Sequence, residues 1–198
     1  MLSLIENFMS TERRQQFFSE SLKLMHHKGY KGTTMRDIAE SMGCDVANLY
    51  NFVRSKEEIL ALSLFKINDE FQQGIDQIIS SQYSPSGKLR LITQLYVRLT
   101  FDKPYEISLL VNGWRFLSDG KKATFLAERN TYEGKVKSVI EEGIAIGELK
   151  ALDPELSTNL VLSSMRWLFD KYVDRQEDFN PVEVERQINE FVLNGIAQ

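Results

Sequence analysis

Apolar residues recur at intervals of three and four along most of this chain, the spacing that puts side chains on one face of an α-helix. In residues 11–28 the pattern includes Phe17 and Leu22, and it stops at Gly29. Glycine after the last periodic residue is a common helix end. We therefore predict a support helix at residues 11–28. Residues 1–9 have no decisive pattern and leave a packed or a frayed arm open.

Residues 33–56 carry the same spacing in two shorter segments separated by Gly43. Thr33 or Thr34 is a good N-cap for the first segment, and Asp45 has a side-chain oxygen that can cap the second. Glycine reverses the chain at low cost because it tolerates positive φ. Two short helices joined by a glycine turn are typical of a helix-turn-helix, whose second helix lies in the major groove of DNA.

The second short helix, predicted from Val46 to Val53, has an apolar face and a face of small and polar residues. Helical spacing directs Leu49, Phe52 and Val53 inward. The outward positions are Val46, Ala47, Asn48, Tyr50 and Asn51. We expect this outer face to meet DNA.

Ser55 and Glu58 have the spacing of a capping box, which predicts that a long helix begins there. An apolar stripe continues from this point, so a helix at 56–82 connects the N-terminal part to the rest. Breaks at proline, glycine and serine predict five more helices, at residues 88–102, 104–118, 121–147, 154–174 and 182–196. No stretch alternates with period two over a strand's length. We predict an all-α protein of about nine helices.

The charge is divided unevenly along the chain. Hydrophobic residues make up 42% and charged residues 26% of the 198 residues, as in ordinary globular proteins, and the net charge is −4. Residues 1–56 hold 8 Lys and Arg against 6 Asp and Glu, whereas residues 57–198 hold 16 against 22. A weakly basic head on an acidic body fits a DNA-binding module joined to one that does not bind DNA. We therefore place the domain boundary after residue 56.

Other classes of protein find little support. No apolar run is long enough for a membrane span and no signal segment precedes the helices, so we expect a cytoplasmic protein that has no membrane partner. The single cysteine, Cys44, fits a reducing compartment and is expected to be a buried, unreactive thiol. His26 and His27 are too close in sequence to share one helix face, which argues against a metal site. Without a nucleophile with its base or a phosphate-binding loop, an enzyme is disfavoured and no cofactor is expected.

Together these features resemble the TetR family of bacterial transcriptional repressors. The matching residues are Phe18, Gly29, Tyr30, Thr33 to Ala39, Gly43, Leu49, Tyr50 and Ser55 to Leu60. A composite signature that spans three helix boundaries is more specific than any single short motif. The resemblance implies a homodimer whose heads enter successive major grooves of a palindromic operator in double-stranded DNA. It also implies that the body binds a small molecule and forms the dimer.

The resemblance assigns DNA contacts residue by residue, to phosphates at the start of the first short helix and to bases and phosphates along the second. The set is Thr33, Thr34, Arg36, Asp45, Val46, Ala47, Asn48, Tyr50, Asn51 and Lys56. The chain departs from the family at Val46, where a basic or polar residue is usual, at Asn51, usually His, and at Val53, usually Phe. Apolar contacts with thymine methyls and amide contacts with adenine favour half-sites that contain A·T pairs. Asp45 is expected to be a cap rather than a base reader.

The last two predicted helices are apolar on more than one side. Residues 154–174 include Leu156, Leu160, Val161, Leu162, Met165, Trp167, Leu168, Phe169 and Tyr172. A helix that is apolar all round is buried on all sides. In a body this small, one side faces the chain's own core and another faces a second copy. We therefore predict a two-fold, four-helix seam made by residues 154–174 and 182–196 of each protomer.

Aromatic residues of the body are candidates for lining a ligand cavity, with amide and guanidinium groups as polar anchors. The candidates are Tyr96, Phe101, Asn112, Trp114, Arg115, Phe116, Phe125, Arg129 and Trp167. Core packing explains most of these residues equally well. The segment from Glu128 to Tyr172 also resembles the C-terminal domains of TetR regulators of lipid and acyl-CoA metabolism. This second resemblance implies a small hydrophobic or acyl-CoA-like effector.

Regulation would follow from geometry. The two heads must stand about 34–36 Å apart to enter grooves one turn apart, so a ligand that tilts the helix at 56–82 spoils that spacing. The sequence leaves open the operator, the effector, and whether the effector releases or promotes DNA binding. It also leaves open a dimeric helical adaptor that has lost DNA binding, because the DNA face is apolar and the positive charge of the head is small.

Overall fold

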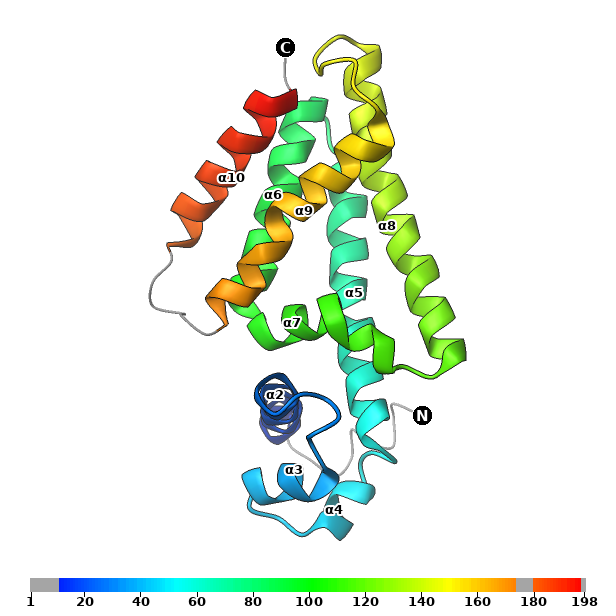
Figure 1. Ribbon diagram of the computed structural model, residues 1–198, viewed down its shortest axis with the longest axis vertical. Coiled ribbons are helices and arrows are strands. Elements are labelled where there is room, and N and C mark those ends of the chain that lie inside the picture. Colours follow the sequence, from blue (N-terminus) through cyan, green and yellow to red (C-terminus); the bar gives the residue numbers. More distant parts are fainter. Residues whose placement is uncertain (1–10, 174–179, 197–198) are drawn as a thin grey trace.

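The computed structural model describes residues 11–173 and 180–196, which form nine α-helices and one 3-10 helix (Figure 1). The helices are α2 (Thr11–His27), α3 (Met35–Ser41), α4 (Val46–Tyr50), α5 (Lys56–Ile79), α6 (Pro85–Asp102), α7 (Pro104–Asn112), η1 (Gly113–Phe116), α8 (Asp119–Ala145), α9 (Pro154–Tyr172) and α10 (Pro181–Ile196). These ranges contain no strand, so the predicted all-α fold is confirmed. The arm at residues 1–9 lies outside the described residues.

Proline and glycine set several helix ends as the sequence predicted. Pro104, Pro154 and Pro181 are the first residues of α7, α9 and α10, where a missing N–H and a fixed φ suit the first turn. Gly29 and Gly43 have φ of +74° and +60°, which a residue with a side chain adopts only with strain. The chain therefore reverses cheaply after α2 and α3.

Several predicted boundaries differ from the structure: α5 ends at Ile79 rather than residue 82, and α8 runs from Asp119 to Ala145 rather than over 121–147. Three further differences have local causes. α4 ends at Tyr50 because the chain then turns and places Val53, only 2% exposed, in the core. α6 begins at Pro85 because the Ser84 hydroxyl accepts a hydrogen bond from the first turn and caps the helix there. The predicted helix at 104–118 divides into α7 and η1. Each difference moves a helix end without changing the order of the helices.

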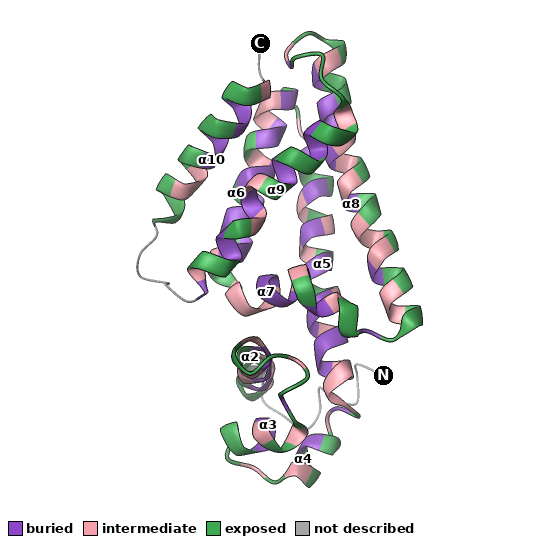
Figure 2. Ribbon diagram, in the orientation of Figure 1, coloured by how far each residue is buried: buried purple, intermediate pink, exposed green. Residues whose placement is uncertain are grey.

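Two hydrophobic clusters hold the chain together. Figure 2 shows that the buried residues alternate with exposed ones along the helices. The upper cluster joins α5, α6, α8, α9 and α10 around Phe71, Ile92 and Met165. The lower cluster joins the head to Leu109, Leu117 and Phe125 of the body. The expected boundary after residue 56 falls at the start of α5, but residues on both sides of it share one core.

Polar and aromatic contacts fix the head against the body. The Glu57 carboxylate at the start of α5 accepts hydrogen bonds from the Ser118 N–H and the Lys121 ammonium, each over 3.1 Å. The Tyr30 ring, in the loop before α3, stacks on Phe116 of η1 with ring centres 4.6 Å apart. The start of α5 and the loop before α3 are therefore both in contact with the body.

Candidate nucleic-acid interface and effector site

α3 and α4 form the predicted pair of short helices, joined by a tight turn. The N–H of Gly43 donates to the Glu40 carbonyl over 3.1 Å, and that of Cys44 donates to the Ala39 carbonyl over 3.0 Å. Ile38 and Ala39 are buried in the lower cluster, and the half-buried Cys44 packs against it. The turn is thus held by the backbone and by the core.

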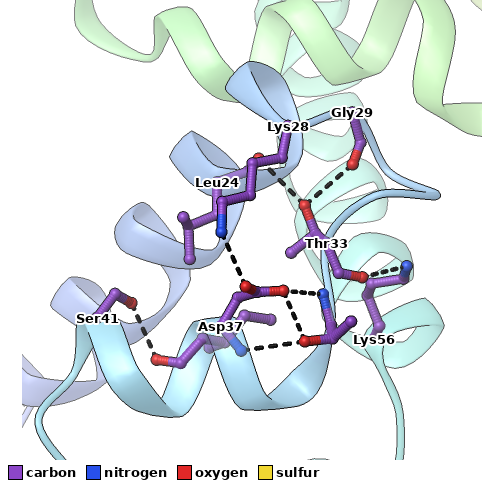
Figure 3. A network of polar contacts seen from close by, with 9 residues as sticks. Leu24, Lys28, Gly29, Thr33, Asp37, Ser41 and Lys56 are labelled. Carbon is purple, nitrogen blue, oxygen red and sulfur yellow. Dashed lines mark hydrogen bonds and ion pairs between the residues drawn. The ribbon is translucent and has the colours of Figure 1, made fainter.

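Thr34 rather than Thr33 caps α3. Its hydroxyl oxygen accepts a hydrogen bond from the Asp37 N–H over 3.1 Å, and Asp37 Oδ2 accepts one from the Thr34 N–H over 2.7 Å. Lys28 Nζ lies 2.8 Å from Asp37 Oδ1 (Figure 3). The hydrogen bond from Lys28 holds the pKa of Asp37 well below its usual range. The three-residue spacing of Thr34 and Asp37 is a capping-box signal that could have decided between the two threonines.

Two residues predicted to contact DNA are instead occupied inside the head. Thr33 is 1% exposed, and its hydroxyl donates to the carbonyls of Leu24 and Gly29 over 3.1 and 3.0 Å. Lys56 Nζ donates to the Thr33 carbonyl over 2.5 Å (Figure 3). The same Nζ also donates to the Tyr30 carbonyl. Burial lowers the pKa of Lys56. In this structure the polar atoms of both side chains are bound within the head, so we no longer expect either side chain to contact DNA directly.

The other predicted DNA contacts lie on the surface of the head. Side chains exposed to solvent are Thr34, Arg36, Asp45, Ala47, Asn48, Tyr50 and Asn51, and Val46 is half-buried. Leu49 and Val53 are buried and Phe52 is half-buried, as the periodicity predicted. Asp45 precedes α4 in an extended conformation, but its side chain makes no capping hydrogen bond. The predicted side-chain cap on α4 is therefore not formed.

Ser55 caps α5 as predicted, and its hydroxyl oxygen accepts a hydrogen bond from the Glu58 N–H over 3.2 Å. In a capping box the Glu58 carboxylate would accept a hydrogen bond from the N–H of Ser55. Here it accepts one from the N–H of Arg54, one residue before the cap. The turn between α4 and α5 is held on both sides of Ser55.

The predicted effector residues do not surround one cavity. Phe125 and Trp114 pack in the lower cluster that joins head and body. Exposed side chains at the ends of α7, η1 and α9 are Asn112, Arg115, Phe116 and Trp167. Some of the candidate aromatic residues therefore belong to the core and others lie at the surface. Residue type alone did not distinguish the two groups.

The three remaining effector candidates lie higher in the body. Phe101 lines a groove of about 520 Å³ formed by α5, α6 and the start of α10. Tyr96 is buried in the upper cluster. Arg129 forms an ion pair with Glu133, with 3.0 Å between Nε and Oε1. Sequence analysis did not single out Glu133, although its spacing of four residues from Arg129 is that of a helix ion pair.

The last two helices each have a buried and an exposed apolar face. On α9, Val161 and Met165 are buried, whereas Leu156 and Leu160 are 59% and 62% exposed. On α10, Phe191 is 76% exposed. Large apolar side chains that are exposed together on a surface mark interaction sites. The sequence predicted one apolar side of each helix against the chain's own core, and the structure has that side. The second apolar side is exposed in the single chain.

Two other predictions concern possible metal and membrane sites. His27 is exposed, while His26 Nδ1 lies 2.8 Å from the Ser108 hydroxyl, so at least one of the two histidines is at the surface as expected. The described ranges contain no group of three potential metal ligands. No helix in those ranges combines the length and apolar character that a membrane span requires.

Comparison with protein families matches both parts of the chain. Residues 18–62 match the family described as bacterial regulatory proteins, tetR family. Residues 82–196 match the family described as tetracyclin repressor-like, C-terminal domain. The two matches cover the head and most of the body.

Individual proteins are similar over nearly the whole chain. The HTH-type transcriptional repressor KstR2 of Mycolicibacterium smegmatis is 26% identical over 190 residues, covering 94% of this chain and 91% of that protein. The structure of the ketosteroid transcriptional regulator KstR2 of Mycobacterium tuberculosis has a TM-score of 0.89 at 20% identity, covering 96% and 97% of the two chains. The structure of AibR in complex with isovaleryl coenzyme A and operator DNA has a TM-score of 0.79 at 18% identity, covering 90% and 97%.

Proposed function

Because the chain belongs to the TetR family of transcriptional regulators, we propose that it is a ligand-responsive repressor that binds a palindromic operator as a homodimer. Members of this family regulate transcription and are not enzymes. The observation that carries the proposal is the exposed outer face of α4, where Ala47, Asn48 and Tyr50 point away from a core held by Leu49.

The proposed interface consists of the start of α3 and the outer face of α4. Thr34, the cap of α3, and Arg36, in its first turn, are exposed at a helix end where backbone N–H groups and the helix dipole favour phosphate. On α4, the Asn48 amide is suited to adenine and the Ala47 methyl to the thymine methyl. Tyr50 is 53% exposed, and we expect it to contact the backbone of the duplex. We keep the prediction of half-sites that contain A·T pairs.

The exposed apolar faces of α9 and α10 support the proposed homodimer. Leu156 and Leu160 are one turn apart on α9, and Phe191 of α10 is 76% exposed. A second copy of the chain, related by a two-fold axis, would cover these side chains in a four-helix seam. The two heads would then be related by the same axis, which requires an operator of matching symmetry.

Effector binding in the body is proposed to change the position of the head. α5 runs from the head into the upper cluster, and Glu57 and Tyr30 tie its start to α8 and η1. A ligand shifts the equilibrium only if it binds two states of the body with different affinity. Of the similar proteins, one is described as a ketosteroid regulator and another forms a complex with isovaleryl coenzyme A, which supports a hydrophobic or acyl-CoA-like effector.

A selection from random-sequence DNA tests the proposal and needs no defined operator. The purified protein is expected to enrich an inverted repeat whose half-sites are centred about 10 base pairs apart, or a multiple of that spacing. An Asn48→Ala, Tyr50→Ala double variant is expected to enrich no such sequence. The matched variant Asn130→Ala, Tyr83→Ala, altered at exposed body positions outside the proposed seam, is expected to behave as wild type. If the wild-type protein enriches no sequence, the dimeric adaptor becomes the better interpretation.

A further inference from the structure

Two tyrosine hydroxyls lie unpaired inside the body. Within the described ranges, Tyr96 Oη and Tyr132 Oη are buried side-chain atoms that have no hydrogen-bond partner, and the two residues are 8% and 9% exposed. A buried hydroxyl without a partner destabilises a fold relative to phenylalanine, which has the same ring. Two hydroxyls that each lower the stability of the ligand-free fold are what we expect of groups that bind a ligand.

The two tyrosines come from different helices and pack on the same ring. Tyr96 of α6 and Tyr132 of α8 have ring centres 5.8 and 5.6 Å from that of Phe71 of α5. Burial raises the pKa of both hydroxyls. Both therefore keep their protons at neutral pH and can donate hydrogen bonds, so a keto or hydroxyl oxygen is a suitable partner.

Two arginines and a glutamate lie beside this pair, where α8 meets α9. Glu133 directly follows Tyr132 on α8, and its Oε1 atom accepts hydrogen bonds from Arg129 Nε over 3.0 Å and from Arg166 of α9 over 3.4 Å. The positive charge of Arg166 acts on Tyr96, whose pKa it lowers against the larger effect of burial. Tyr132 and the ion-pair cluster of Glu133 therefore occupy neighbouring positions on α8.

The ion-pair cluster is suited to exchange one carboxylate for another. Two guanidinium groups share the single carboxylate of Glu133, and all three side chains are partly exposed, between 28% and 38%. Arginine binds carboxylates through paired, charge-assisted hydrogen bonds. A ligand carboxylate that takes the place of Glu133 at Arg166 removes a contact between α8 and α9. Binding at this point therefore changes how the two helices are held together.

We propose that Tyr96, Tyr132, Arg129 and Arg166 form the effector-recognition site, and that its ligand is an apolar carboxylic acid with a keto or hydroxyl oxygen along its carbon skeleton. The carboxylate binds the arginines in place of Glu133, and the inner oxygen accepts hydrogen bonds from the two tyrosine hydroxyls. The hydrocarbon lies among the apolar side chains of the upper cluster. This inference rests on the proposed function, in which a ligand bound to the body controls DNA binding.

Thermal unfolding of the ligand-free protein tests the state of the hydroxyls. Tyr96→Phe and Tyr132→Phe are expected to unfold at the wild-type temperature or above it, because each removes a hydroxyl that has no partner. Tyr83→Phe, at a position 62% exposed, is the matched control. Unfolding several degrees below wild type for the two buried variants, with the control unchanged, overturns the inference, because the hydroxyls would then be hydrogen-bonded in the free protein.

Calorimetric titration with defined acids tests the ligand class. The probes are 4-, 6- and 8-oxododecanoate, dodecanoate, and dodecanoyl coenzyme A. The wild-type protein is expected to bind at least one oxo acid about three- to tenfold more tightly than dodecanoate, and Tyr96→Phe or Tyr132→Phe is expected to reduce that preference. The inference is overturned if the wild type binds none of the acids, if the variants keep the full preference, or if the coenzyme A thioester binds more tightly than every free acid.

The arginine end is tested separately. Glu133→Gln is expected to tighten binding of the preferred oxo acid and to leave binding of its methyl ester unaffected. Arg166→Gln is expected to weaken binding of the acid about tenfold or more. Arg90→Gln, at an exposed position on α6, is the control. Equal effects on acid and ester overturn the assignment. Operator binding by the ligand-free wild type is measured on the same preparation. Failure of operator binding counts against the proposed function, and failure of acid recognition alone counts against this inference.

Discussion

The Lys56 ammonium, on the first residue of α5, lies 2.5 Å from the carbonyl oxygen of Thr33, the residue before the cap of α3. The same ammonium lies 4.3 Å from the centre of the Tyr30 ring, whose other contact is with Phe116 of the body. One lysine thus connects the long helix, the loop before α3 and the body. Its effect on DNA binding is therefore expected to be indirect.

Lys56→Met is expected to lower the free energy of unfolding by about 1–3 kcal/mol, because it removes charge-assisted hydrogen bonds to two backbone carbonyls. Operator affinity is also expected to fall, since α3 and α4 are no longer held in register with α5. Urea unfolding and DNA titration measure the two effects. Lys31→Met, at an exposed position in the same loop, is the control. Wild-type stability together with reduced, less salt-dependent DNA binding would instead indicate a direct phosphate contact.

The two adjacent threonines are expected to respond differently to substitution. Thr33→Val removes a buried hydroxyl that donates to two carbonyls, so it is expected to cost about 1–3 kcal/mol of stability. Thr34→Ala removes the cap of α3 and is expected to cost about 1 kcal/mol. After correction for the folded fraction, only the Thr34 variant is expected to bind operator more weakly. A specific DNA defect in Thr33→Val would contradict the placement of that side chain inside the head.

The head is expected to lose stability in acid through Asp37. Its pKa in the folded protein is held below the ordinary value of 3.8, first by the hydrogen bond from Lys28. A lowered folded-state pKa contributes stability that is present above the unfolded-state pKa and is lost as the pH falls towards the folded-state value. Asp37→Asn is therefore expected to be less stable than wild type at neutral pH, with a difference that shrinks below about pH 4.

Thermal unfolding of wild type and Asp37→Asn between about pH 3 and pH 7 measures this effect. Asp170→Asn, at an exposed position on α9, controls for the loss of one negative charge. A difference between wild type and Asp37→Asn that stays constant down to the lowest pH would show that the carboxylate of Asp37 does not stabilise the folded head.

Most helix boundaries could be predicted from the sequence because local chemistry sets them. Pro104 and Pro154 suit first turns, Gly43 has the positive φ that the turn needs, and the Ser55 hydroxyl caps α5. The inward residues of α4 followed from helical spacing. Local signals left the choice between Thr33 and Thr34 open, and one of them was misread at Asp45, which precedes α4 without capping it.

The effector residues could not be predicted in the same way, because their roles depend on contacts between distant segments. Phe125 belongs to the lower cluster because α8 starts next to the head, and nothing in its local sequence indicates this. In the sequence Tyr132 is one more bulky aromatic residue, yet its buried hydroxyl, like that of Tyr96, has no hydrogen-bond partner in the structure. The type of a residue shows that it can belong to a core. Only the hydrogen-bond partners of its polar atoms, which the structure gives, distinguish a core residue from a candidate ligand contact.

The seam between protomers is expected to depend on the exposed face of α9. Leu160→Glu places a charge in the proposed four-helix interface and is expected to convert the dimer to a monomer, which light scattering coupled to size exclusion detects. Tyr83→Glu, which is equally exposed at 62% but lies in the loop between α5 and α6, is expected to remain dimeric. A dimer for both variants would show that α9 does not form the seam.

The most direct measurement is fluorescence anisotropy of a labelled fragment of the protein's own upstream DNA, titrated with wild type and with the Asn48→Ala, Tyr50→Ala variant across a salt series. A repressor that contacts phosphates on both half-sites is expected to lose affinity by about two to three powers of ten between about 50 and 200 mM salt, and the variant to lose the tight binding at every salt concentration. Weak binding that neither salt nor the substitutions change, on this fragment and on sequences selected at random, would contradict operator recognition by α4.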